Sequence, residues 1–315
     1  MKYACVTLPL WTADIEIDEE LAMRLVAEQF PELAHLPLEP LGLGWDNAVF
    51  VVGGRFAFRF PRRRVAVPLI AREIAILPRI APHLPLPIPA PVFVGIASTA
   101  YPSPFAGYEM IGGATACSVS LSEEDRLRLA APLGRFLAAL HAIDPVPLVE
   151  LGLPLDEIGR LDHAKRVRIV GERIPSLAAA GAIDADAFMT WFRTQSPETI
   201  DDAKRTLVHG DLYARHVLVD DAGTPTGVID WGDVHLGDAA LDIAIAHSML
   251  PPSAHGTFRD AYGTIDERTW NAARYRALDH AVLEFDYGIR ADDAGMRSIG
   301  SAALQRLGVG PPTRP

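Results

Sequence analysis

Residues 206–232 read TLVHGDLYARHVLVDDAGTPTGVIDWG. The segments TLVHGDLYARHVLVD and TGVIDW are typical of a small pair of strands, because each contains a run of apolar residues. These segments also contain two aspartates, Asp211 and Asp230. A positioned carboxylate can accept the proton of a hydroxyl group, and a carboxylate is also a preferred ligand of magnesium. The stretch therefore predicts a polar site that is built on a small sheet.

The spacing of the polar residues in this stretch follows a pattern found in kinases. Residues 209–211 (HGD), then His216, then residues 230–232 (DWG) align with H-R-D-x-x-x-x-N followed by D-F-G. In that pattern the first aspartate accepts the hydroxyl proton and the second holds magnesium. We therefore predict Asp211 as the catalytic base and Asp230 as a magnesium ligand. His216 replaces the usual asparagine, and we expect it to assist Asp230 directly or through a water, although magnesium prefers oxygen.

A glycine-rich turn lies near the start of the chain. Residues 42–49, GLGWDNAV, match G-x-G-x-x-G-x-V except that asparagine replaces the third glycine. Asparagine is the non-glycine residue that best tolerates a left-handed backbone, so the turn remains possible. Such a turn can bring backbone N–H groups over phosphates. We expect this loop to bind a nucleotide through Gly42, Gly44, Asn47 and Val49.

The strand that follows the turn at Gly53-Gly54 has two distinct faces. Phenylalanines at 56, 58 and 60 alternate with Ala57 and Arg59, so the phenylalanines lie on one face and Ala57 and Arg59 on the other. This layout matches the V-A-I-K strand of kinases, with arginine in place of lysine. We expect Ala57 to contact a base and Arg59 to contact phosphates. Glu73, on a helix predicted over 69–77, is expected to hold Arg59 in place.

The order of elements predicts an α+β chain, because strands come first and helices follow. The apolar strand AGYEMI ends at Gly112-Gly113, which predicts a boundary between an N-lobe sheet, residues 1–111, and a mostly helical C-lobe, residues 112–315. We expect the backbone of this strand, from Glu109 to Ile111, to contact a nucleotide base. Ser122, followed three residues later by Asp125, predicts the start of a long helix.

Charge and composition limit the classes of partner. The net charge is −11, which argues against nucleic acid. Residues 1–110 carry 9 basic and 11 acidic side chains, so −9 of the charge falls on residues 111–315. That acidity suits either a cationic substrate or simply a solvated surface, and three acids are candidates for substrate binding: Asp279, Glu284 and Asp286.

The location expected from the sequence is the cytoplasm. Two cysteines, Cys5 and Cys117, lie far apart, which predicts no disulfide framework and fits a reducing compartment. Residues 1–20 lack a convincing signal-peptide cleavage site, and prolines interrupt the apolar stretch 78–104, so we expect no membrane partner. A monomer is favoured.

The run VHGDLYARHVLVD…GVIDWGDVHLGDAALDIA resembles the aminoglycoside phosphotransferase family, which includes macrolide kinases. The resemblance covers about residues 40–250, and the segments GWDN, FRFPR, HGDL and IDWGD carry it. It implies a protein-kinase-like fold with two lobes, ATP or GTP as phosphate donor, Mg2+, and transfer to a hydroxyl group of an antibiotic. It also implies that Asp238 and Asp242 brace the catalytic loop, and macrolide kinases resemble this chain in carrying histidine at the position of His216.

Three alternatives remain open. The same scaffold serves kinases of ordinary metabolites, such as an amino alcohol or a sugar. A non-catalytic nucleotide-binding protein would require His216 to prevent metal binding, and the presence of both Asp211 and Asp230 argues against it. A protein kinase is disfavoured, because no A-P-E segment follows residues 230–232.

Overall fold

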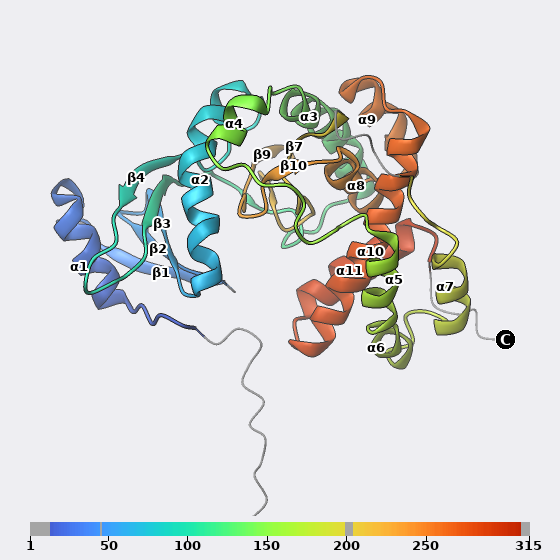
Figure 1. The fold of residues 1–315 in the computed structure, drawn as a ribbon, viewed down its shortest axis with the longest axis horizontal. Coiled ribbons are helices and arrows are strands. Elements are labelled where there is room, and N and C mark those ends of the chain that lie inside the picture. The colour runs from blue at the N-terminus through green and yellow to red at the C-terminus, as the bar shows by residue number, and fades with distance from the viewer. Residues whose placement is uncertain (1–12, 45, 199–203, 310–315) are drawn as a thin grey trace, which may run out of the picture. The chain divides into compact units, whose positions relative to one another are not determined.

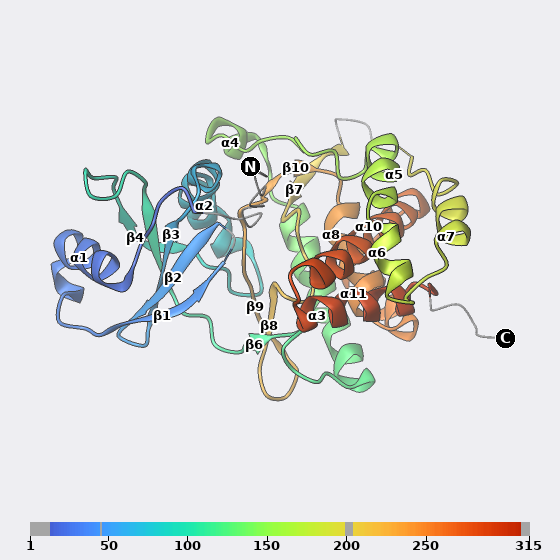
Figure 2. The ribbon, with the colours of Figure 1, turned by 90° about the horizontal axis from the view of Figure 1, so that it is seen from below.

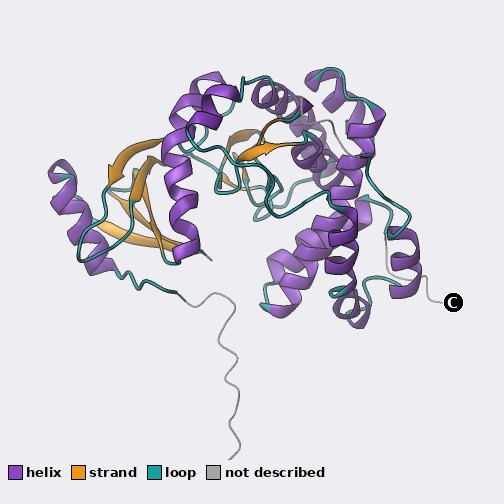
Figure 3. Cartoon of the chain, in the orientation of Figure 1, coloured by secondary structure: helices purple, strands orange, loops and turns teal. Residues whose placement is uncertain are grey.

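The computed structural model describes residues 13–44, 46–198 and 204–309 (Figure 1). The chain divides into two compact units. The first consists of residues up to Pro82 together with Ile88–Ile111, and the second of His83–Pro87 together with the residues from Gly112 onward. Strands dominate the first unit and helices the second (Figure 3).

The first unit contains a five-stranded antiparallel sheet in the order β1-β2-β3-β5-β4. Its strands are β1 (Leu38–Leu43), β2 (Asn47–Val52), β3 (Phe56–Pro61), β4 (Pro91–Gly95) and β5 (Phe105–Glu109). The turn predicted at Gly53-Gly54 joins β2 to β3 in a hairpin, and its two glycines have positive φ values of 60° and 65°. Glycine adopts this conformation without steric cost, which explains the pair at a two-residue turn.

Helices cover both faces of this sheet. The phenylalanines of β3 are buried with residues of helix α1 (Glu19–Gln29) in one core cluster. On the opposite face, Ile70 of helix α2 (Val67–Ile80) packs with Ala106 and Tyr108 of β5. The predicted alternation of β3 is therefore confirmed, since Phe56, Phe58 and Phe60 are buried while Ala57 and Arg59 are only partly so.

The bounds predicted for the helix over 69–77 were wrong. The helix expected over 69–77 begins earlier, with Pro68 in its first turn, and continues through Pro78 to Ile80. Proline is tolerated there because it lies in the last turn, where one missing N–H removes one backbone hydrogen bond. Helix α1 ends at Gln29, and a 3-10 turn, Pro31–Leu33, follows it.

The second unit is mainly helical (Figure 3). Its helices are α3 (Glu123–His141), α4 (Val146–Glu150), α5 (His163–Gly171), α6 (Ile174–Ala179), α7 (Ala185–Phe192), α8 (Ala240–Met249), α9 (His255–Tyr262), α10 (Glu267–Arg290) and α11 (Ala294–Arg306). The predicted start of α3 is confirmed, because Ser122 and Asp125 form a reciprocal capping box. Helix α10 packs against α8 and α11, and its residues Tyr275, Leu278 and Val282 are buried in the core of this unit.

Two small sheets complete this unit. Strand β8 (Val217–Val219) pairs with β9 (Pro225–Val228) and with β6 (Ala114–Thr115), as Figure 2 shows. Strand β7 (Thr206–Val208) pairs separately with β10 (His235–Gly237), a strand that the sequence did not predict. Among the described residues, no helix is both long enough and apolar enough to cross a membrane.

Candidate active site

The loop between β7 and β8 carries the residues 209–211 that matched the kinase pattern. Its backbone bends at Gly210, whose φ is +83°. A Cβ at this position would lie 2.6 Å from the carbonyl oxygen of Asp233 and 2.7 Å from the ring of His235. Both the conformation and the space therefore require glycine between His209 and Asp211.

Asp242, on α8, fixes the backbone of this loop. Its carboxylate accepts hydrogen bonds from the backbone N–H groups of His209 at 2.7 Å and Gly210 at 2.9 Å. It also lies 3.2 Å from Nε2 of His141, whose Nδ1 lies 2.8 Å from the hydroxyl oxygen of Tyr262. Burial alone would raise the pKa of Asp242, but the hydrogen bond and charge of His141 lower it. An ionised, fully buried carboxylate thus holds the loop, as the family resemblance implied.

Asp238 has a different role from the one implied. Its Oδ1 accepts from the backbone N–H of Ala240 at 2.9 Å and so stabilises the start of α8. Arg268 donates to both of its oxygens, at 2.6 and 3.1 Å. Asp238 therefore joins α8 to α10 and makes none of these contacts with the catalytic loop.

The carboxylate of Asp211 lies among three basic side chains. Its Oδ1 is 3.2 Å from Nε2 of His280 and 3.9 Å from a guanidinium nitrogen of Arg276, both on α10. Its Oδ2 is 3.8 Å from Nδ1 of His216. Burial by itself would raise the pKa of Asp211, but the hydrogen bond and charge of His280, with the charges of His216 and Arg276, lower it far below its ordinary value. Asp211 is therefore ionised, and its carboxylate can accept a hydrogen bond from a hydroxyl group.

His216 links the two aspartates of the pattern. Its Nδ1 donates to the backbone carbonyl of Asp211 at 2.8 Å, because a carbonyl oxygen only accepts. In the neutral ring Nε2 then carries the lone pair, and Nε2 lies 3.4 Å from Oδ2 of Asp230. Asp230 has an unusual backbone for a non-glycine residue, with φ of +66°, and its side chain is 51% exposed.

Of this pair, the Asp230 carboxylate is a ligand type that magnesium prefers, whereas the ring nitrogen of His216 is a poorer one. Magnesium keeps several waters and commonly takes only one or two carboxylates from a protein, with phosphate oxygens completing its shell. The carboxylate of Asp230 is exposed, whereas the His216 ring, whose Nε2 faces it, is buried. Within the described ranges, no group of three or more His, Cys, Asp or Glu side chains could form a metal site by itself.

The first unit brings together Arg59 and Glu73 as predicted. One guanidinium nitrogen of Arg59 donates to both oxygens of Glu73, at 2.9 and 3.0 Å, and the two residues come from β3 and α2. The hydroxyl of Tyr108 on β5 also donates to Glu73, at 3.0 Å. The side chain of Glu73 is 1% exposed and that of Arg59 17% exposed, so the pair is well shielded from water.

The other predicted nucleotide-binding residues lie on the same sheet. Gly42 on β1 pairs with Val49 on β2, and the N–H of Gly44 donates to the carbonyl of Asn47 at 2.8 Å. Asn47 does not use the left-handed conformation that asparagine tolerates, because it begins strand β2 and its φ is not positive. Trp45 lies outside the described residues.

The end of β5 differs slightly from the prediction. The strand ends at Glu109, so Met110 and Ile111 follow it. The side chain of Glu109 pairs with Arg55 at 2.7 Å, and both side chains are largely exposed.

Two of the three acids predicted to bind a cationic substrate form ion pairs with arginines instead. Asp279 is fully buried and accepts from Arg166 at 2.8 Å and from Arg276 at 2.9 Å. Asp286 is also buried and pairs with Arg290 at 2.9 Å. Both carboxylates are thus neutralised within the second unit.

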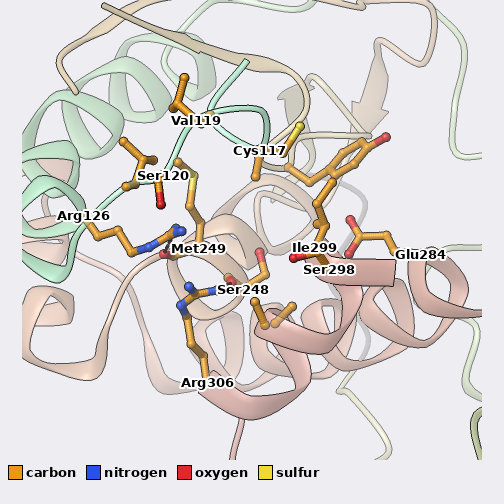
Figure 4. Close-up of a pocket in the computed structure, with 16 residues that line it drawn as sticks. Cys117, Val119, Ser120, Arg126, Ser248, Met249, Glu284, Ser298, Ile299 and Arg306 are labelled. Carbon is orange, nitrogen blue, oxygen red and sulfur yellow. Dashed lines mark hydrogen bonds between the residues drawn. The ribbon is translucent and has the colours of Figure 1, made fainter. Parts of the chain in front are cut away.

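The third acid, Glu284, lines a pocket of about 220 Å³ in the second unit (Figure 4). The pocket is also lined by Tyr213 and Ala214 from the catalytic loop. Burial raises the pKa of Glu284, and its Oε1 lies 3.6 Å from Nδ1 of His280.

The sequence did not point to His280 or to its contact with Asp211. The two residues are far apart in the chain, and only the packing of α10 beside the catalytic loop brings them together. A faint signal was available, since His280 and Glu284 are four residues apart on one helix and therefore lie on the same face. His141 is a hydrogen-bonded core histidine, as its contacts with Tyr262 and Asp242 show.

Comparison with known proteins agrees with these features. A model of the phosphotransferase enzyme family matches residues 37–278. An uncharacterized protein, YcbJ of Bacillus subtilis (strain 168), is 21% identical over 138 residues. That match spans 44% of this chain and 44% of the relative, less than half of either.

Two solved structures share the fold. The GDP and kanamycin complex of the aminoglycoside phosphotransferase APH(2")-IIIa is 23% identical, with a TM-score of 0.67, over 91% of this chain and 98% of that one. The macrolide 2'-phosphotransferase MphH from Brachybacterium faecium is 22% identical, with a TM-score of 0.61, over 94% of this chain and 99% of that one. These similarities confirm the predicted kinase-like α+β fold.

The family model covers most of the chain, including the catalytic loop, Arg59 and Glu73. The match confirms the predicted phosphotransferase activity and the family that the sequence resembled. The protein belongs to the phosphotransferase enzyme family.

Proposed function

We propose that the protein is a small-molecule kinase that transfers the γ-phosphoryl group of ATP or GTP to a hydroxyl group. One observation carries the proposal, the ionised Asp211 held on a fixed loop beside the donor pair of His216 and Asp230. A phosphoryl transfer requires a group that positions and deprotonates the hydroxyl, and a site for a metal on the phosphates. The second unit offers a candidate for each, Asp211 for the first and Asp230 with His216 for the second.

The three site residues of the second unit have separate roles in this proposal. Asp211 orients the acceptor hydroxyl and takes its proton as the oxygen bonds to phosphorus and the nucleoside diphosphate leaves. Asp230 and His216 would hold magnesium, which would neutralise charge on the phosphates. The hydrogen bond from Nδ1 of His216 to the carbonyl of Asp211 orients the ring so that Nε2 faces Asp230. Most of the rate enhancement then comes from positioning and electrostatic stabilisation.

The first unit is proposed to bind the nucleotide. Arg59, oriented by Glu73, would neutralise phosphate charge, as the lysine–glutamate pair does in kinases. At Gly42 a Cβ would meet no described atom within 4 Å, so the fold itself does not require glycine there. Close approach of a ligand to the backbone explains a glycine at such a position. Gly44, Asn47 and Val49 belong to the same hairpin, and Ala57, Glu109 and Ile111 complete the proposed set.

The first candidate acceptor is an antibiotic, whose phosphorylation would confer resistance. The support is the fold shared with an aminoglycoside and a macrolide phosphotransferase. The second candidate is a metabolite, and one observation favours it. Asp279 and Asp286, the acids that could have bound a polycationic drug, already pair with arginines.

A nucleotide-consumption screen tests the proposal. ATP and GTP with magnesium would be supplied with macrolides, aminoglycosides and hydroxyl-bearing metabolites, and product would be identified by mass. We expect one acceptor class to gain a single phosphoryl group. If neither nucleotide is consumed above background with any acceptor, and neither raises the thermal midpoint at millimolar concentration, the kinase assignment is wrong.

A further inference from the structure

The pocket of about 220 Å³ beside the catalytic loop has one strongly basic side (Figure 4). Arg126 of α3 and Arg306 of α11 both line it, and Figure 4 shows them on one side with Glu284 on the opposite side. Hydroxyl groups of serines also line the pocket, at Ser120, Ser248 and Ser298. The pocket thus offers cationic and hydroxyl donors within one small space.

Both arginines contact the C-terminal end of α8. Arg126 donates through one nitrogen to the carbonyl of Met249 at 3.1 Å, and Arg306 donates through one nitrogen to the carbonyl of Ser248 at 3.0 Å. Cations are favourable near the negative end of a helix, so these bonds orient both side chains. A guanidinium carries five N–H donors, however, and capping uses only a part of that capacity.

The two arginines lack a carboxylate partner within ion-pair distance in the part of the chain that the structure describes. The carboxylate of the adjacent Asp125 bonds to Ser122 and Arg128 instead. The fully buried arginines of this unit behave differently, since Arg160, Arg166 and Arg276 each pair with an aspartate.

Placing these two cations together is unfavourable without an anion. Burial lowers the pKa of Arg126, and burial together with the charge of Arg126 lowers the pKa of Arg306 to about 10. Half-buried like charges repel one another more strongly than exposed ones, because less water screens them. An oxyanion between the guanidinium groups would relieve this repulsion and accept paired N–H donors.

The pocket shares its wall with the catalytic loop. Tyr213 and Ala214 lie two and three residues after Asp211 and line the pocket. Glu284, on the opposite side from the arginines, approaches His280 at 3.6 Å, and His280 contacts Asp211 at 3.2 Å. A molecule held by the arginines therefore lies next to the residues that surround the proposed base.

We propose that Arg126 and Arg306 bind the carboxylate or phosphate group of the acceptor, so that the kinase acts on a small anionic alcohol. This inference rests on the proposed kinase function and specifies the class of acceptor. The size of the pocket agrees, since pockets that enclose drug-sized ligands commonly have volumes of about 300–1,000 Å³. A polycationic aminoglycoside is the wrong charge for the basic side of this pocket.

Binding of inorganic sulfate tests the site without turnover. The thermal midpoint would be measured with sulfate and with chloride at equal ionic strength, for the wild type, Arg126→Gln and Arg306→Gln. We expect sulfate to raise the wild-type midpoint by about 2–4 °C at ten times its Kd, and to lose this increment in both variants. Arg135→Gln, an exposed arginine of the same helix α3, serves as the control and should keep the increment.

Sulfate bound elsewhere, for example at Arg59, gives a different pattern. An equal increment in all four proteins would overturn the proposed site. Because Arg126 and Arg306 also cap α8, the glutamine variants are liable to fold poorly. Arg126→Lys and Arg306→Lys then replace them, and since lysine lacks the planar fork, each should keep only part of the increment. A full increment in both lysine variants and no loss on double substitution would also overturn it.

Turnover identifies the acceptor class. Matched pairs of acceptors, each a small hydroxy acid and its uncharged amide, would be offered to the wild type and the same variants. We expect the acid to have at least a tenfold higher kcat/KM, and Arg306→Gln to remove that preference. Equal use of acid and amide by the wild type contradicts the anionic substrate class. No transfer to any acceptor, with the sulfate result intact, would instead contradict the kinase function and leave the anion site standing.

Discussion

Nε2 of His280 lies 3.2 Å from Oδ1 of Asp211, although the two residues come from different elements. The contact gives the proposed base a fixed orientation, because one of its oxygens is held by α10 and the other remains for a hydroxyl group. His280 in turn lies 3.6 Å from Glu284, four residues further along the same helix. This arrangement identifies His280 as a positioning residue for Asp211.

His280→Ala should lower kcat by about 10- to 100-fold, the range expected when a reacting group is misplaced by roughly 1 Å. KM for the nucleotide should change little, since the contacts that His280 makes with Asp211, Tyr213 and Glu284 all lie within the second unit. His280→Gln should recover part of kcat, because its amide can still donate to Asp211. His83→Gln, at an exposed histidine, is the control. An unchanged kcat in His280→Ala would remove His280 from the mechanism.

Gly210→Ala should destabilise the protein and reduce turnover together. The new Cβ meets Asp233 and His235 at 2.6–2.7 Å, and the φ of +83° is unfavourable for alanine. A loss of about 1–3 kcal/mol in the free energy of unfolding is expected. Gly256→Ala is a matched control, because it lies in α9 with no described atom within 4 Å of the new Cβ. Equal unfolding midpoints for the two variants would show that the loop tolerates a side chain.

His216→Asn tests the metal assignment. Asparagine can donate to the carbonyl of Asp211 through its amide nitrogen and present an oxygen, which magnesium prefers. Activity should be kept or raised, and the half-saturating magnesium concentration should fall. Loss of activity in a variant that still unfolds at the wild-type midpoint would mean that histidine has another role.

Acid should destabilise the protein through His247. This ring is buried against Trp270 and its Nε2 lies 3.2 Å from the carbonyl of that residue. Burial, assisted by the charge of His255, lowers its pKa to about 3. Between this value and ~6.5 the unfolded state binds a proton that the folded state does not, so the free energy of unfolding falls as the pH falls.

The loss attributable to His247 should be on the order of 3 kcal/mol at pH 4. Urea unfolding at pH 7, 5.5 and 4 measures it. His247→Gln should flatten this dependence, whereas the exposed His83→Gln should not. Parallel curves for His247→Gln and the wild type would show that other groups control the acid limb.

Local patterns predicted much of the fold and the position of the catalytic loop. The alternation of β3 placed Arg59 on the face that α2 covers, and the spacing to Glu73 was enough to predict their ion pair. Contacts that depend on helix packing could not be predicted this way. His280 contacts Asp211, and Arg126 and Arg306 line one pocket, because residues of α10, α3 and α11 that are far apart in the sequence pack together in the second unit.

The same limit explains why the acidic residues were misleading. Asp279 and Asp286 lie in an acid-rich stretch and resembled a cation site in the sequence. Asp279 pairs with Arg166 of another helix, and Asp286 pairs with Arg290. The sequence alone could not predict the pairing between helices. Asp279 and Asp286, which the sequence suggested as cation ligands, are buried in ion pairs with arginines.

Phosphoryl transfer by Asp211→Asn tests the account most directly. Asparagine keeps the size of the side chain but cannot accept the hydroxyl proton. With an acceptor identified by the screen, the account predicts that kcat falls by at least about 10²-fold, while the Kd of the magnesium nucleotide stays within about twofold. Asp230→Asn should instead weaken nucleotide binding and turnover together. Retention of wild-type kcat by Asp211→Asn, at unchanged stability, would contradict the assignment of Asp211 as the base.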